Sequence, residues 1–85
     1  MSPDDMAIPV PAAIALTATA RRHASQHKIL EQVLAAALPD TCQVGDLVAL
    51  EIHGGVHEFV VYRRRWEMAR DTPPRLEITL DRPAR

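Results

Sequence analysis

The stretch "LVALEIHGGVHEFVVYRRRWE", residues Leu47–Glu67, decides the fold. Apolar and polar residues alternate on both sides of Gly54-Gly55, and glycine supplies the positive φ that tight hairpin turns require. We therefore predict a β-hairpin with a two-residue Gly-Gly loop, in which His53 pairs with Val56. Because side chains alternate between the faces of a sheet, this register gathers the core residues on one face. These residues are Val48, Leu50, Ile52, Phe59 and Val61.

The segment before the hairpin, "AAIALTATARRHASQHKILEQVLAAALP" (residues 12–39), consists mostly of good helix formers. Its second half has apolar residues at helical spacing, and Pro39 ends the pattern because proline disfavours helical backbone before it. Those apolar residues are Leu30, Val33, Leu34, Ala37 and Leu38. The start stays open, since Thr17 and Ser25 are both suitable N-caps. Residues 13–20 also alternate as a strand would, although their alanine content favours helix.

After the hairpin, "LEITLD" (Leu76–Asp81) alternates apolar and polar residues and predicts a third strand. The order of elements predicts an α+β fold, with one N-terminal helix packed on a three-stranded antiparallel β-meander. We expect residues 13–85 to form one small domain. Residues 1–12 contain several prolines and two adjacent acids, and they predict a flexible tail.

The composition limits the class of protein. A net charge of −1 and a pI near 6.4 argue against a general nucleic-acid binder. The one cysteine, Cys42, can form no internal disulfide, which suits a reducing cytoplasm. Residues 7–20 are apolar like part of a signal peptide, but acids precede them where a signal peptide has positive charge. We therefore expect a cytoplasmic protein without a membrane segment.

The second face of the predicted sheet is the candidate binding surface. A single helix covers only one face, so the other face exposes an apolar cluster with an arginine, and such patches often mark interfaces. We predict that this cluster binds a partner, either a second copy of the chain or another protein. Its residues are Leu47, Val60, Tyr62, Arg64 and Trp66. Alternatively, Tyr62 and Trp66 pack under the Pro73-Pro74 loop or under the N-terminal segment.

Three consecutive arginines complicate this assignment. Strict alternation points Arg63 and Arg65 toward the core side and Arg64 toward the free face. Two arginines are not buried without acids, so either the core ends near Val61 or a β-bulge shifts the register. The basic stretch also suggests a second function, nucleic-acid binding, which four nearby glutamates oppose. Its candidate residues are Arg63, Arg64, Arg65, Trp66, Arg21, Arg22 and Lys28.

No pattern indicates catalysis or a cofactor. His23 and His27 share a helix face, but two ligands do not make a metal site. His53 and His57 flank the turn with opposite parity and are expected on opposite faces. We also expect so short a chain to leave little room for a ligand pocket. The sequence therefore predicts a non-enzymatic protein-interaction or accessory module that self-associates and binds no metal or cofactor.

Overall fold

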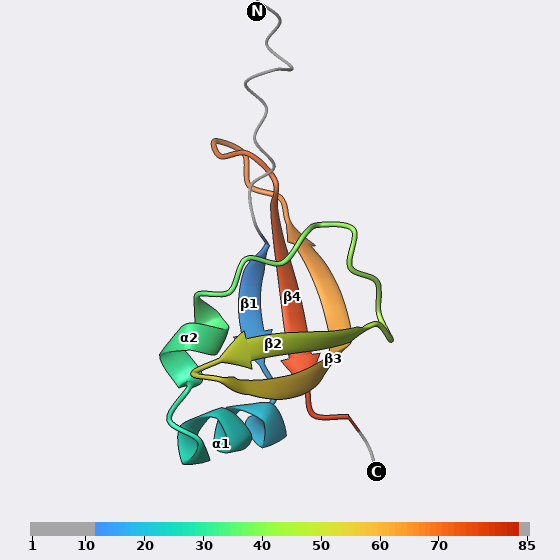
Figure 1. The fold of residues 1–85 in the computed structure, drawn as a ribbon. Coiled ribbons are helices and arrows are strands. Elements are labelled where there is room, and N and C mark those ends of the chain that lie inside the picture. The colour runs from blue at the N-terminus through green and yellow to red at the C-terminus, as the bar shows by residue number, and fades with distance from the viewer. Residues whose placement is uncertain (1–11, 84–85) are drawn as a thin grey trace, which may run out of the picture.

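The computed structural model describes residues 12–83, which fold into two helices on a four-stranded sheet (Figure 1). The strand order is β1-β4-β3-β2, with β1 parallel to β4 and the other pairs antiparallel. The elements are β1 (Ala13–Leu16), α1 (Ala18–Gln26), α2 (Leu30–Leu34), β2 (Leu47–Ile52), β3 (Gly55–Glu67) and β4 (Arg75–Asp81). The α+β class is confirmed, and the predicted meander is present as β2-β3-β4. The sheet is nevertheless mixed, because β1 adds a parallel strand.

Residues 13–20 are divided between a strand and a helix, so the preference for helix is wrong for Ala13–Leu16. Long-range pairing with β4 outweighs the helix propensity of alanine, since β1 places Ile14 and Leu16 beside Ile78 and Leu80. Thr17 follows immediately as the N-cap of α1, accepting a hydrogen bond from the backbone N–H of Ala20 at 3.2 Å. The predicted tail lies outside the described residues except for Ala12, which is buried and bridges Leu38.

The predicted long helix is broken into α1 and α2 at Lys28. The backbone N–H groups of Lys28 and Ile29 donate to the carbonyls of Ser25 and Ala24, which is the Schellman pattern of helix termination. Lys28 takes the left-handed conformation, with φ 58°, that this motif usually gives to glycine. Ile29 is buried directly after the break. The apolar spacing was therefore real, but a lysine at the glycine position concealed the helix end.

The hairpin prediction is confirmed, with a register that differs by two residues. Ile52 pairs with Gly55, so the loop is His53-Gly54 rather than Gly54-Gly55. Both loop residues have positive φ, 53° for His53 and 80° for Gly54, as a type I′ turn requires. A shift of two preserves the alternation, so the predicted core face is correct. Phe59 and Val61 are fully buried on that face.

A bulge in β3 decides where the three arginines lie. Val61 pairs with Leu80, but the next pair is Arg63 with Thr79, so Tyr62 is an extra residue. Beyond the bulge, Arg64 and Trp66 oppose Ile78 and Leu76 on the core side. The prediction from strict alternation is therefore wrong for all three arginines, and the bulge that we weighed as the alternative is present.

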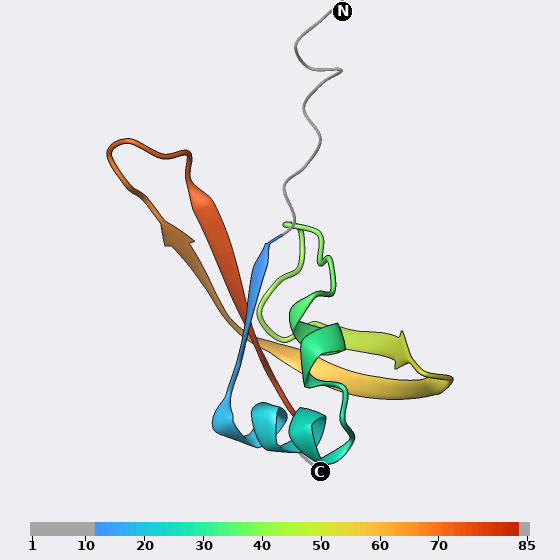
Figure 2. The same ribbon diagram turned by 90° about the vertical axis from the view of Figure 1, so that its left-hand side faces the viewer.

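The helices cover one face of the sheet. Buried residues of both helices pack with alternate residues of the strands. The core comprises Ala12, Ala20, Ala24, Ile29, Val33, Leu38, Phe59, Val61, Leu76, Ile78 and Leu80. Figure 2 shows the distal part of the β3–β4 hairpin projecting beyond the helices. We call the opposite side of the sheet, which neither helix covers, the outer face.

Candidate interaction surfaces

The outer face of β2 and β3 is apolar at its centre. Leu47 pairs with Val60, and Tyr62 follows at the bulge. Leu47 is 64% exposed and Tyr62 is 59% exposed, which are high values for large apolar side chains. Val56, near the turn, is also exposed and was not among the predicted residues. Together with the half-buried Val60, these exposed side chains give the hairpin an apolar strip.

Charged residues of opposite sign flank this strip. Glu51 and Glu58 lie toward the hairpin turn, and Arg63 lies beyond the bulge. All three are exposed, and none takes part in the ion pairs found within residues 12–83. Arg65 differs, because its guanidinium lies 3.2 Å from Glu67 and 3.7 Å from Glu77. The outer face therefore has an acidic end, and beyond the bulge it carries Arg63, an exposed cation that takes part in neither of these pairs.

The five residues predicted as one partner surface do not share a face. Leu47 and Val60 lie on the outer face and the bulge residue Tyr62, which follows them, is exposed, whereas Arg64 and Trp66 beyond the bulge lie on the core side. Strict alternation fails in β3 because the strand contains an extra residue, and side chains switch faces at such a point. No glycine or proline in the stretch signals the bulge, so only the implausibility of burying Arg63 and Arg65 hinted at it.

A hydrogen bond from the Arg64 side chain joins a long loop to the sheet. Arg64 Nη2 donates to the backbone carbonyl oxygen of Asp40 at 2.8 Å, across the chain segment that joins α2 to β2. Its Nε is fully shielded from solvent and has no hydrogen-bond partner among the described residues. The Nε side of the guanidinium thus lies against protein. Arg64 has a structural contact that a freely exposed binding residue would lack.

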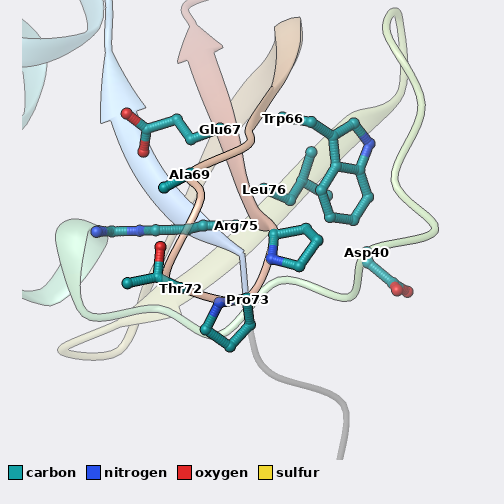
Figure 3. Close-up of a pocket in the computed structure, with 9 residues that line it drawn as sticks. Asp40, Trp66, Glu67, Ala69, Thr72, Pro73, Arg75 and Leu76 are labelled. Atoms are coloured by element: carbon teal, nitrogen blue, oxygen red, sulfur yellow. The ribbon is translucent and has the colours of Figure 1, made fainter.

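Trp66 lines a pocket near the tip of the β3–β4 hairpin (Figure 3). The pocket has a volume of about 610 Å³, which is within the range of small-molecule sites and contradicts the expectation of too little room. Its walls are mainly apolar, with Asp40 on one side and the Glu67–Arg75 region on the other. The lining residues are Asp40, Trp66, Glu67, Ala69, Thr72, Pro73, Pro74, Arg75 and Leu76. Trp66 is 50% exposed, so the hairpin loop covers it only in part.

The residues suggested for nucleic-acid binding are dispersed. Arg63 lies on the outer face and Arg64 on the core side, while Arg65 is paired with two acids. The other candidates, Arg21 and Arg22, lie on α1, and Lys28 follows that helix. The three adjacent arginines therefore do not form one basic cluster.

Three histidines meet between α1 and β3. His23 Nε2 lies 3.1 Å from His57 Nδ1, a hydrogen bond in which one ring donates and the other accepts. The ring centroids of His23 and His27 are 4.3 Å apart, and the ring centroid of His57 is 5.3 Å from each of them. The sequence indicated only the first pair, because the contact with His57 depends on tertiary packing. Burial lowers the pKa of His23, and the charges of Arg82, His27 and His57 lower it further.

This cluster predicts a pH-dependent stability. A lowered pKa means that the folded state favours neutral His23, so its stabilising effect is present above the usual pKa of 6.5. We expect the free energy of unfolding to decrease as pH falls from 7.5 to 5.5, measured by urea denaturation. His23→Gln removes the titrating group and is expected to make this decrease shallower. An unchanged slope in that variant would contradict the assignment.

Within residues 12–83, no group of three or more His, Cys, Asp or Glu side chains is arranged to hold a metal ion. Cys42 is a half-buried free thiol that packs against the core. None of the helices in the described part of the chain is long and apolar enough to cross a membrane. We take the outer face and the Trp66 pocket as the candidate interaction surfaces.

Comparison of the chain with protein-family models, with curated proteins and with solved structures finds no match.

Proposed function

We propose that this chain is a non-enzymatic protein-interaction module that self-associates through its outer face. The observation that carries the proposal is the strip formed by Leu47, Val60 and Tyr62 on the face that the helices leave uncovered. Exposed apolar area is favoured to leave water, and tyrosine is among the residue types enriched in binding hot spots. The flanking charges supply the polar rim that protein interfaces commonly have.

The outer face is a better candidate than the Trp66 pocket for a contact between proteins. Its apolar residues belong to paired strands, which hold them in place before any partner binds. The pocket instead depends on the loop between β3 and β4, whose residues lie outside regular structure. Nucleic-acid binding is the weaker proposal, because Arg63 and Arg64 lie on different sides of the sheet and Arg65 is paired with acids.

Two aromatic substitutions test the proposal. Tyr62→Ala is expected to weaken self-association about tenfold or more, since it removes a central aromatic side chain from the contact. Trp66→Ala is the matched control, because Trp66 has similar exposure but lies on the other side of the sheet. Sedimentation velocity over a concentration series measures both effects. A wild-type chain that stays monomeric at high concentration would contradict self-association, and equal weakening by both variants would contradict the choice of face.

A further inference from the structure

The arrangement of charges on the outer face has a symmetry that the proposed self-association can use. Glu58 lies two residues before Val60 on β3. Beyond Val60, the ladder places Val61 opposite Leu80 and Arg63 opposite Thr79, so Arg63 is two ladder positions away. The bulge residue Tyr62 adds no position to the ladder. Glu58 and Arg63 are therefore equidistant from Val60, on opposite sides and on the same face.

We propose that two copies pack outer face to outer face about a two-fold axis near Val60, with their β3 strands antiparallel. This inference rests on the proposed self-association and adds the orientation of the two copies. A two-fold interface uses the same patch on both subunits, so it requires a patch that is complementary to itself. Rotation about Val60 brings Glu58 of each copy onto Arg63 of the other, which gives two pairs of opposite charge. The same rotation stacks Leu47 and Val60 of both copies at the centre.

Neighbouring charges are compatible with this arrangement. Asp81, which pairs with Val60 in the ladder, has its Oδ1 occupied by the Thr17 hydroxyl and by the backbone N–H of Arg82. Arg65 is paired with Glu67 and Glu77, and Arg75, which is opposite Glu67 in the ladder, offsets the second acid. A parallel arrangement of the two β3 strands would instead place Glu58 near Glu58 and Arg63 near Arg63. Like charges opposed in this way penalise that orientation.

Charge reversal in a mixing experiment tests the orientation. Glu58→Arg and Arg63→Glu are each expected to weaken homodimerisation about tenfold or more, because each variant opposes like charges twice across the two-fold axis. An equimolar mixture of the two variants is expected to regain an affinity close to that of the wild type. In the mixed dimer, every position 58 faces a position 63 of opposite charge. Arg70→Glu, in the loop between β3 and β4, is the control and should leave association unchanged.

The outcomes separate the orientation from the self-association. If the wild type associates and the mixture is no tighter than either variant alone, the antiparallel arrangement is wrong while self-association stands. If neither reversal weakens association, another surface holds the copies together. A monomeric wild type overturns both proposals. Circular dichroism of each variant must show the wild-type melting temperature, so that a loss of association is not a loss of folding.

Discussion

Replacing Phe59 with alanine is expected to destabilise the fold by about 3–5 kcal/mol, which is a large part of the stability of a small domain. Phe59 is 0% exposed and is the largest of the fully buried side chains. It lies in the hairpin strand that also pairs with β4, so its removal leaves a cavity between the helices and the sheet. Urea denaturation followed by circular dichroism measures the change.

Tyr62→Ala is the matched control for this experiment. Tyr62 is an aromatic residue on the same strand, three positions further on, but it is 59% exposed. We expect its replacement to change the free energy of unfolding by less than about 0.5 kcal/mol at concentrations where the chain is monomeric. Similar losses from both substitutions would mean that Phe59 is not the centre of the core.

Replacing Arg64 with alanine is expected to cost about 1–2 kcal/mol, because a charged donor to the Asp40 carbonyl is lost. The effect should be local as well as global. Once Arg64 no longer holds it, the segment between α2 and β2 is expected to exchange its amide hydrogens faster than in the wild type. Urea denaturation and hydrogen exchange measure the two effects.

Arg63→Ala provides the comparison for Arg64→Ala, since the two arginines are adjacent in sequence but lie on opposite sides of the sheet. Arg63 is exposed on the outer face and takes part in no ion pair found among the described residues. We expect its replacement to change stability by less than about 0.5 kcal/mol. A larger loss of stability from Arg63→Ala than from Arg64→Ala would mean that β3 has no bulge at Tyr62.

Local patterns predicted the hairpin well. Alternation on both sides of a glycine pair identifies the two strands and the face that Phe59 occupies. The register was wrong by two residues because His53 takes the positive φ that we assigned to Gly55. Histidine accepts this conformation at a modest energetic cost, so the dipeptide alone could not place the turn.

Features that depend on distant residues could not be predicted in this way. Strand β1 forms because it pairs with the edge of β4, and nothing within Ala13–Leu16 specifies that pairing. The helix end at Lys28 lacks the expected glycine, and the bulge at Tyr62 has no glycine or proline beside it. Each of these features is stabilised by tertiary packing, which outweighs local preference.

The candidate site was predicted in part. Leu47 and Tyr62 are exposed and Val60 is half-buried, whereas Arg64 and Trp66 were assigned to the wrong side by counting through the bulge. From the sequence, Glu58 was only one of the acids that oppose phosphate binding, and Arg63 was only a candidate for binding nucleic acid. Their relation to Val60 emerges from the ladder, because Glu58 and Arg63 are unequally spaced from Val60 in sequence but equally spaced in the sheet.

The hydroxyl of Thr17 donates to Asp81 Oδ1 at 2.6 Å, across 64 residues of sequence. The same threonine caps α1, so the start of that helix is joined to the last residues of β4. During synthesis, β1 emerges long before the strand that it must pair with exists. The β2–β3 hairpin can form early, but closing the β1–β4 loop carries a large entropic cost and comes late. Pulse-labelled hydrogen exchange during refolding should therefore protect the hairpin amides before the amide of Thr17.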